Sequence, residues 1–394
     1  MYKRQIGDHL IKAISKRIEA WLIDDYTAAR IGGDEFAILM PSISADKAHE
    51  TAQQLLALIS NPYSIDDHLL YCTTSVGISV FPSVNSTNID VLRQADTALY
   101  RAKVAGRNKY MFYEPEMQAQ VESFLEIEKG LHEALNKGQL ELYYQPQVNG
   151  AQQIVGVEAL IRWNHPEKGV LPPGVFMPIA EETGQILQIG NWIIEQACYQ
   201  YSRWRKQGVL PDTFRRLAIN ISPLQFSQNS FVEHIHDVLA QADIDGEHIE
   251  LEITENLLLE NVESAIQRMS ELKQHNLKIS IDDFGTGYSS LRYLKHLAVD
   301  VLKIDRSFVT QLHLDESDQA IVDTIIMTAQ RLNLEVIAEG VEDANELNTL
   351  KQLGCDQFQG YLFDKPLPAS ELISRFEANF YPVEGSPTIK AVQK

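Results

Sequence analysis

Cysteine is scarce in this sequence, and long apolar runs are missing. The three cysteines, Cys72, Cys198 and Cys355, lie far apart and form no CxxC or Cys/His pattern, which argues against a thiolate metal site or a disulfide framework. They predict reduced thiols in a cytoplasmic protein. No apolar run approaches the roughly 20 residues that a membrane-spanning helix needs, and no signal-peptide pattern opens the chain. We therefore expect no direct membrane contact from this chain, and any membrane or sensor region would precede Met1 in a longer protein.

Basic residues are also much fewer than acidic ones. The 394 residues include 34 Lys and Arg against 54 Asp and Glu, so the formal net charge is −20. Such a surface repels polyanions, which argues against broad binding to a nucleic acid polymer or to anionic lipid. A substrate that carries phosphate would need metal ions to bridge the like charges.

The first part of the chain has an α+β pattern. Its spacing predicts a helix over 1–20, a hairpin over 29–40 with Gly32 and Gly33 at the tip, and helices over 44–60 and 88–105 that flank a strand over 73–80. Three motifs stand in this region: Arg30-Ile-Gly-Gly-Asp-Glu-Phe36, Ser75-Val-Gly-Ile-Ser79 and Ala95-Asp-Thr-Ala-Leu-Tyr-Arg-Ala-Lys-Val-Ala-Gly-Arg-Asn108. Through them the region resembles the GGDEF family of diguanylate cyclases.

The resemblance begins near Ile6 and covers only the later part of that family's domain. The earlier part, which carries the first metal-binding Asp and the residues that hold guanine, has no counterpart here. We therefore predict that residues 1–113 are a truncated and catalytically inactive GGDEF-like domain, with Asp34 and Glu35 as solvated turn residues. The abrupt start suggests a fragment of a longer protein. A linker over 114–121 is expected to follow.

From residue 122 to 380, strand-like runs alternate with amphipathic helices. The predicted strands are 139–148, 155–163, 215–222, 249–254, 278–284, 301–305, 335–341 and 357–361. This pattern suits an α/β fold of the (β/α)8 TIM-like barrel class. The hairpin-sized connection Asn149-Gly-Ala-Gln152 would make the first strand pair antiparallel. A doubly wound open sheet is the alternative, and residues 381–394 are predicted to be a C-terminal tail.

Polar residues interrupt these apolar strands, at least one for each strand and most of them at or beyond its middle. In a barrel the carboxyl ends of the strands meet at one mouth, where active sites form. Burying several acids there without cations would cost several kcal/mol for each unpaired charge. Oxygen ligands without His or Cys favour Mg²⁺ or Mn²⁺, and a cluster of this size can hold two ions. The residues are Gln145, Glu158, Asn220, Glu252, Asp282 with Asp283, Lys303, Glu339 and Gln359.

The stretch Lys278-Ile-Ser-Ile-Asp-Asp-Phe-Gly-Thr-Gly-Tyr-Ser-Ser290 ends a buried strand on two adjacent carboxylates. Adjacent side chains on a strand point to opposite faces, so Asp282 and Asp283 can share a site only if the backbone bends. Gly285 and Gly287 would permit the bend. Lys303 could supply part of the counter-charge that the pair needs. Taken alone, the pair would more simply be a helix-capping Asp beside a surface Asp; the other polar residues favour a shared site.

Over residues 122–380 the chain resembles the EAL family of cyclic di-GMP phosphodiesterases. The resemblance rests on a series of motifs in order: Glu158-Ala-Leu-Ile-Arg-Trp163, Asn220-Ile-Ser222, Glu252-Ile-Thr-Glu255, Asp282-Asp-Phe-Gly-Thr-Gly287, Lys303-Ile-Asp305, Glu339-Gly-Val-Glu342 and Gln359-Gly-Tyr361. It implies a hydrolase that converts cyclic di-GMP to linear pGpG by in-line attack of water, with two Mg²⁺ or Mn²⁺ ions in each active site.

The resemblance also implies roles for residues. Positions matching Glu158, Asn220, Glu252 and Asp282 bind one metal ion, and those matching Asp282, Asp283 and Glu339 help to bind a second. Lys303 would orient and help to activate the attacking water, and Gln359 would hold water near the ions. A general-base role for Lys303 needs a lowered pKa, whereas a role as counter-ion does not.

Other matched positions concern the substrate and a loop. Glu255 would fix the loop of Asp282, Asp283, Phe284, Gly285, Thr286 and Gly287, which mediates homodimer contacts in the family. Arg162 would meet a substrate phosphate, with Gln145 and Leu160 in the same pocket. Asp305 would contact guanine or merely pair with Arg306. Two other functions stay open: a non-catalytic cyclic di-GMP receptor that signals through dimerisation, and a bifunctional cyclase-phosphodiesterase, against which the truncated first domain argues.

Overall fold

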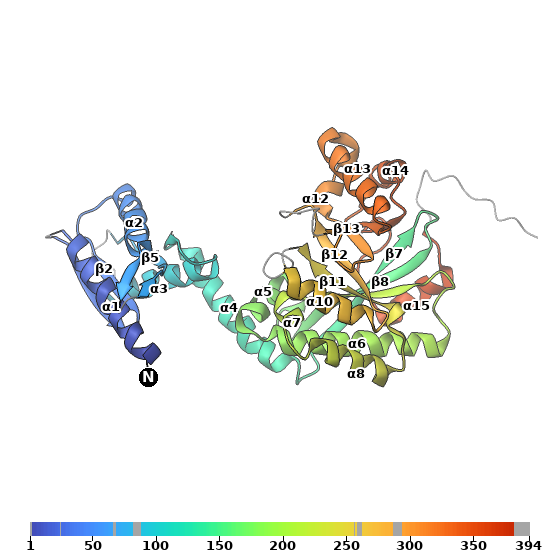
Figure 1. The fold of residues 1–394 in the computed structure, drawn as a ribbon, viewed down its shortest axis with the longest axis horizontal. Coiled ribbons are helices and arrows are strands. Elements are labelled where there is room, and N and C mark those ends of the chain that lie inside the picture. Colours follow the sequence, from blue (N-terminus) through green and yellow to red (C-terminus); the bar gives the residue numbers. More distant parts are fainter. Residues whose placement is uncertain are drawn as a thin grey trace, which may run out of the picture. The chain divides into compact units, whose positions relative to one another are not determined.

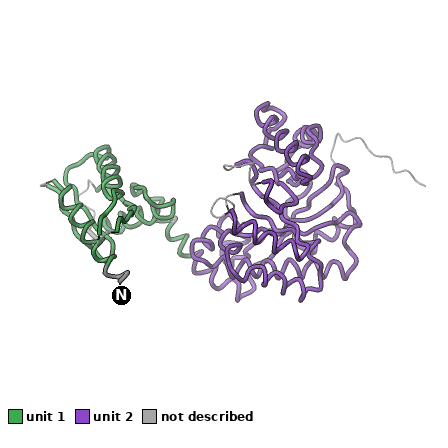
Figure 2. The backbone as a smooth tube through the Cα atoms, viewed as in Figure 1, with its two compact units in different colours: residues 1–126 green, residues 127–394 purple. Residues whose placement is uncertain are grey.

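The computed structural model describes residues 2–23, 25–65, 68–81, 88–255, 257, 262–286 and 294–381. The chain divides into two compact units, residues 1–126 and 127–394 (Figure 2). The division falls within helix α4 (Pro115–Ala134), so most of the stretch expected to be a linker is helical. Pro115 suits the first helical position, because its missing N–H would have no partner there in any case. Among the described residues no helix combines the length and the apolar character needed to cross a membrane.

The first unit alternates helices with short two-stranded sheets. It contains α1 (Tyr2–Trp21), the antiparallel hairpin of β1 (Thr27–Gly32) and β2 (Glu35–Leu39), α2 (Ala45–Ser60), the antiparallel pair of β3 (Tyr63–Ile65) and β4 (His68–Leu70), β5 (Val76–Ile78), α3 (Asn88–Val104) and β6 (Tyr110–Phe112), which pairs parallel with β5. The predicted hairpin and helices are confirmed. Gly33 takes φ +47° in the hairpin turn, a conformation that side chains other than glycine rarely adopt.

The second unit is built around a closed barrel of eight strands (Figure 1). Neighbouring strands follow the order β7, β8, β10, β11, β12, β13, β14 and β15, and β15 pairs with β7 to close the ring. Closure excludes the open doubly wound sheet. As the hairpin predicted, β7 runs antiparallel to β8; it also runs antiparallel to β15, whereas the other strands of the ring are parallel. The bounds are β7 (Leu140–Asn149), β8 (Ile154–His165), β10 (Arg216–Ile221), β11 (Ile249–Thr254), β12 (Lys278–Phe284), β13 (Val301–Ile304), β14 (Glu335–Ala338) and β15 (Gln357–Gln359).

Helices surround this barrel (Figure 1). They bury apolar residues in its core. In α6 (Ile186–Gln207), Ile186, Ile189, Ile193 and Ala197 are buried at helical spacing. Each fully buried Ile stabilises the fold by about 1.5–3 kcal/mol relative to an exposed one. The other helices of more than four residues in the described barrel segment are α5 (Pro173–Thr183), α8 (Phe231–Ala242), α10 (Val262–Lys273), α13 (Glu316–Arg331), α14 (Ala344–Gln352) and α15 (Ala369–Ala378).

Candidate functional site

The end of β12 brings two adjacent carboxylates to one side of the sheet. The pairing of β12 with β13 shifts register between Ile281 and Phe284, and Asp283 itself takes φ +54°. The bend therefore lies at Asp283 and not only at the glycine that follows; Gly285 has φ +102°, and Gly287 lies outside the described residues. As a result, carboxylate oxygens of Asp282, Asp283 and Glu339 all lie within 4.8 Å of one another.

Lys303 lies at the centre of the acidic cluster. Its side chain comes from the buried strand β13 and is 1% exposed. Its Nζ lies 2.8 Å from Glu252 Oε1, 3.2 Å from Asp282 Oδ1 and 2.5 Å from Glu339 Oε1. Burial opposes its charge, but the surrounding acids, Asp282 first among them, raise its pKa well above the usual 10.5. In the absence of metal ions Lys303 is therefore a protonated counter-ion.

Glu158 is held in place by two amide donors. Asn220 Nδ2 donates to Glu158 Oε1, and Gln359 Nε2 donates to Glu158 Oε2, both at 2.5 Å. Burial opposes ionisation of this carboxyl, yet Lys303 and the two amides lower its pKa below the ordinary value. Gln359 Nε2 also donates to Gln145 Oε1, and Gln145 Nε2 donates to the carbonyl of Asp364. Four strands thus fix this part of the site.

Several carboxyl groups of the cluster resist ionisation. Burial and then the charge of Glu158 raise the pKa of Glu252 well above its usual value. Burial raises the pKa of Glu339 to about 8, and burial together with Asp282 raises that of Asp283 to about 6. Glu252 Oε2 has no hydrogen-bond partner among the residues that the structure describes.

This donor set fits hard divalent ions. The cluster offers carboxylate oxygens and one Asn amide oxygen, with no His or Cys among the predicted ligands, and Mg²⁺ and Mn²⁺ prefer such ligands. Extra positive charge would relieve the repulsion that raises the pKa of Asp283 and Glu339. Of the two predicted ligand sets, only Asp282, Asp283 and Glu339 already converge within ligand distance of one another.

The predicted loop and substrate residues are placed as follows. Glu255 Oε2 accepts a hydrogen bond from the backbone N–H of Gly285 at 3.3 Å, so it contacts the loop after β12. Phe284 is buried, whereas Thr286 is exposed and donates to the carbonyl of Asp283. Leu160 and Arg162 follow Glu158 at spacings of two on β8, which puts the three side chains on one face.

Arg162 and Asp305 make contacts that sequence reasoning could not specify. Arg162 Cζ lies 5.4 Å from the centre of the Tyr143 ring. Asp305 is the N-cap of the short helix α12 (Arg306–Val309) and accepts from the N–H of Ser307. Arg306 pairs with Glu342 at 2.8 Å, so the suggested pairing with Asp305 is wrong. A contact of Asp305 with guanine stays a prediction.

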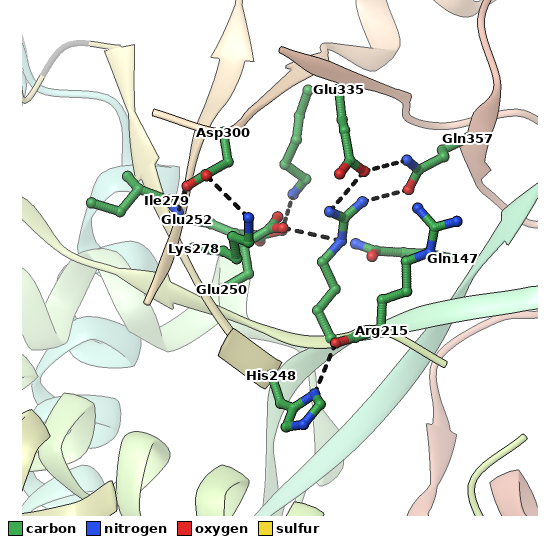
Figure 3. A network of polar contacts seen from close by, with 12 residues as sticks. Gln147, Arg215, His248, Glu250, Glu252, Lys278, Ile279, Asp300, Glu335 and Gln357 are labelled. Atoms are coloured by element: carbon green, nitrogen blue, oxygen red, sulfur yellow. Dashed lines mark hydrogen bonds and ion pairs between the residues drawn. The ribbon is translucent and has the colours of Figure 1, made fainter. Parts of the chain in front are cut away.

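Sequence reasoning missed a second polar cluster inside the barrel, formed by Arg216, Glu250, Glu335 and Gln357. Figure 3 shows Gln147, Glu250, Glu335 and Gln357 pointing into one region. Arg216 joins three of them: its Nε lies 3.1 Å from Glu250 Oε2, its Nη1 lies 3.0 Å from Glu335 Oε2, and its Nη2 donates to Gln357 Oε1. The sequence did carry a signal for polar side chains deeper in the barrel. Residues two apart on a strand share a face, and three pairs have this spacing: Gln145 and Gln147, Glu250 and Glu252, and Gln357 and Gln359.

Comparison with protein families identifies both regions. The family model of the EAL domain matches residues 128–366, which is more than half of the chain. This chain belongs to the EAL domain family. The model described as diguanylate cyclase, GGDEF domain, matches residues 2–109. The barrel described above is therefore an EAL domain, and a GGDEF region precedes it.

Curated relatives match nearly the whole of this chain. The bifunctional diguanylate cyclase/cyclic di-GMP phosphodiesterase MucR of Pseudomonas aeruginosa is 39% identical over 376 residues, which cover 95% of this chain and 54% of MucR. The cyclic di-GMP phosphodiesterase PdeR of Escherichia coli (strain K12) is 37% identical over 368 residues, covering 93% of this chain and 55% of PdeR. The chain thus spans about half the length of these relatives.

A solved structure is similar to the EAL domain. It is described as PaMucR phosphodiesterase in complex with c-di-GMP, and it has 41% sequence identity and a TM-score of 0.60. The match covers 63% of this chain and 99% of that chain. The fold predicted from the sequence, a TIM-like barrel preceded by a GGDEF region, is confirmed.

Proposed function

We propose that this chain is a metal-dependent phosphodiesterase that hydrolyses cyclic di-GMP to linear pGpG. The observation that carries the proposal is the set of five carboxylates around one buried lysine, with Asn220 and Gln359 on Glu158. Support comes from the relative named a cyclic di-GMP phosphodiesterase and from the similar structure that is described as a c-di-GMP complex.

The proposed metal ligands are Glu158, Asn220, Glu252 and Asp282 for one ion, and Asp282, Asp283 and Glu339 for the other. Two bound Mg²⁺ or Mn²⁺ ions would supply the positive charge that makes a water molecule acidic and stabilises the charge on the phosphate. The protein's part is to hold the ligands in place. Asn220 and Gln359 orient Glu158, and Glu255 holds the loop after β12 through the Gly285 N–H.

Lys303 acts in this proposal as a charged donor. Its Nζ carries protons and can donate hydrogen bonds to a water or a phosphate oxygen within the acidic cluster. A general base would need a lowered pKa, whereas in the chain without metal ions the acids around Lys303 raise its pKa. Arg162, which is half-buried on the same face of β8 as Glu158, supplies a further cation for a substrate phosphate.

The test is hydrolysis of cyclic di-GMP by the purified chain with Mg²⁺ or Mn²⁺. Glu158→Gln and Lys303→Met should each reduce pGpG formation by at least about 100-fold, because each removes charge or ligation at the reacting centre. Glu233→Gln, which changes an exposed carboxyl of α8, serves as the matched control and should retain activity. Tight binding of the nucleotide without turnover under either metal would instead identify a receptor.

Three further proposals accompany this function. The GGDEF region is inactive as a cyclase, which incubation with GTP and Mg²⁺ would test. The EAL domain forms a homodimer through the loop around the exposed Thr286, and sedimentation of Thr286→Arg against the unaltered chain tests that interface. The chain acts in the cytoplasm in this proposal, as its few and widely spaced cysteines predict.

A further inference from the structure

Gln147 is a fully buried amide that lies one step deeper in the barrel than Gln145. It comes from β7, where it is 0% exposed. Because β7 runs opposite to the other strands, Gln145 pairs with Glu158, whereas Gln147 pairs with Gly156 on β8 and with Gln359 on β15. Its Nε2 donates to Gln359 Oε1 at 3.1 Å. Gln147 therefore contacts Gln359, a residue of the candidate site, from the side that faces the interior of the barrel.

This contact agrees with the contact to Glu158 on which way the Gln359 amide points. Gln359 Nε2 donates to Glu158 Oε2 and to Gln145 Oε1, and Gln359 Oε1 accepts from Gln147. A carboxylate only accepts hydrogen bonds, so a flipped Gln359 would press its own oxygen against Glu158. The flipped amide would also place its NH₂ group against the NH₂ group of Gln147. The donor at Gln147 thus opposes the flip from the other side.

The surroundings of Gln147 indicate that its amide does more than fill space in the core. A Cβ atom on Gly156 would lie 2.8 Å from Gln147 Oε1 and 2.9 Å from the carbonyl oxygen of Arg216, so glycine at this position leaves room for both the amide and the neighbouring strand. Among the described residues Gln147 Oε1 has no hydrogen-bond partner. A buried polar atom without a partner costs stability, and an apolar side chain would avoid that cost. The hydrogen bond that Gln147 donates to Gln359 is the described interaction that offsets this cost.

We propose that Gln147 is a positioning residue, which acts through Gln359 to hold Glu158 in its place among the ligands. The inference rests on the proposed function where turnover is concerned. It also applies to metal binding alone, since Glu158 is a proposed ligand. Gln147 touches neither substrate nor metal ion in this proposal, and its whole effect passes through the Gln359 amide.

The test is a double-mutant cycle in the full chain, made of Gln147→Met, Gln359→Met and the pair together. Calorimetric titration gives the Mn²⁺ affinity, and hydrolysis of cyclic di-GMP gives kcat and KM. We expect Gln147→Met to weaken Mn²⁺ binding and to lower kcat by about three- to tenfold each, the size of one buried hydrogen bond. In the Gln359→Met background the same change should have no further effect on either quantity.

Gln357→Met is the matched control. Like Gln147→Met it removes a buried amide, and Gln357 lies on β15, two residues before Gln359. Gln357 contacts Arg216 and Glu335 and not Glu158. We expect Gln357→Met to lower the melting temperature. Its Mn²⁺ affinity and its kcat should stay within about twofold of those of the unaltered chain. If Gln147→Met folds poorly, Gln147→Leu replaces it in the same cycle.

Two results would overturn the inference: effects of Gln147→Met and Gln359→Met that simply add, or a loss of melting temperature in Gln147→Met with unchanged Mn²⁺ affinity and kcat. Failure of the proposed function looks different. A chain that binds Mn²⁺ but hydrolyses no cyclic di-GMP would refute the phosphodiesterase, while the Mn²⁺ affinities of the cycle would still decide the role of Gln147.

Discussion

Asp283 follows Asp282 on β12 with a backbone φ of +54°, and this left-handed residue lets the two neighbouring carboxylates reach one place. In a regular strand they would point to opposite faces. A residue other than glycine in this conformation is strained by roughly 1–2 kcal/mol, less for Asp and Asn than for most. The site is therefore built partly by a local strain that the rest of the barrel has to offset.

Substitutions at Asp283 should separate strain from charge. Asp283→Gly removes the carboxylate and the strain, whereas Asp283→Ala removes the carboxylate and keeps a strained backbone. We expect the glycine variant to be more stable than the alanine variant by about 1 kcal/mol in urea unfolding. Both should lose metal-dependent hydrolysis to the same degree. Equal stability of the two variants would show that the left-handed conformation is not retained in solution.

Removal of the lysine charge should make the fold depend on metal ions. Lys303→Met leaves Glu252, Asp282 and Glu339 without their shared cation. Loss of one partner of a buried ion pair costs about 3–5 kcal/mol. We expect the melting temperature of the variant to fall in EDTA and to rise on addition of Mg²⁺ by more than that of the unaltered chain. The same rise in both proteins would contradict the counter-ion role.

The stability of the metal-free chain should fall as pH rises from about 5 to 8. Burial raises the pKa of Glu339 to about 8 and that of Asp283 to about 6 in the folded chain, and the pKa of Glu252 is raised in the same direction. Over this window the folded state holds more protons than the unfolded state, so ionisation on raising the pH favours unfolding. Lys303 stays protonated in both states below its usual pKa of 10.5 and adds no slope here.

Urea unfolding in EDTA across this pH range measures the effect. Glu339→Gln cannot ionise at this position, so its stability should fall less over the same range. Saturating Mg²⁺ should flatten the slope of the unaltered chain, because positive charge lowers the pKa of these carboxyl groups. An identical slope in Glu339→Gln would mean that Glu339 is not the group that titrates.

The ion pair of Arg216 with Glu250 should stabilise the barrel away from the proposed reacting centre. Both side chains are buried, and Arg216 Nε lies 3.1 Å from Glu250 Oε2. Arg216→Met should cost about 3–5 kcal/mol in urea unfolding, because it strands the Glu250 charge. Arg216→Met combined with Glu250→Met should recover most of that loss. A double variant no more stable than Arg216→Met would refute this account.

Much of the barrel could be predicted because its strands are apolar runs of β-branched residues and its helices carry a clear stripe. The site was found for the same reason: Glu158, Glu252 and Lys303 interrupt runs that otherwise read as core. The convergence of Asp282, Asp283 and Glu339 followed from their places at strand ends. Their assignment as ligands stays a prediction.

What could not be predicted depends on local geometry and on long-range contacts. The left-handed turn at Asp283 has only a weak signal in residue type, since Asp tolerates this conformation better than most residues but usually adopts others. Arg216 follows Arg215 at the start of a strand, and nothing in the sequence says which of the two points inward. The partner of Arg306 lies 36 residues ahead at Glu342 and not at the adjacent Asp305, because Asp305 is occupied as a helix cap.

The reversed direction of β7 determines where the polypeptide joins the barrel. In a barrel of parallel strands the chain would come in at the bottom, but Leu140, the first residue of β7, pairs with Trp163 near the carboxyl end of β8. Helix α4 therefore delivers the chain to the rim that carries the acidic cluster, and five residues after Leu140 the strand reaches Gln145. The same helix thus leads directly into the strand whose Gln145 accepts a hydrogen bond from Gln359, the same amide that donates to Glu158.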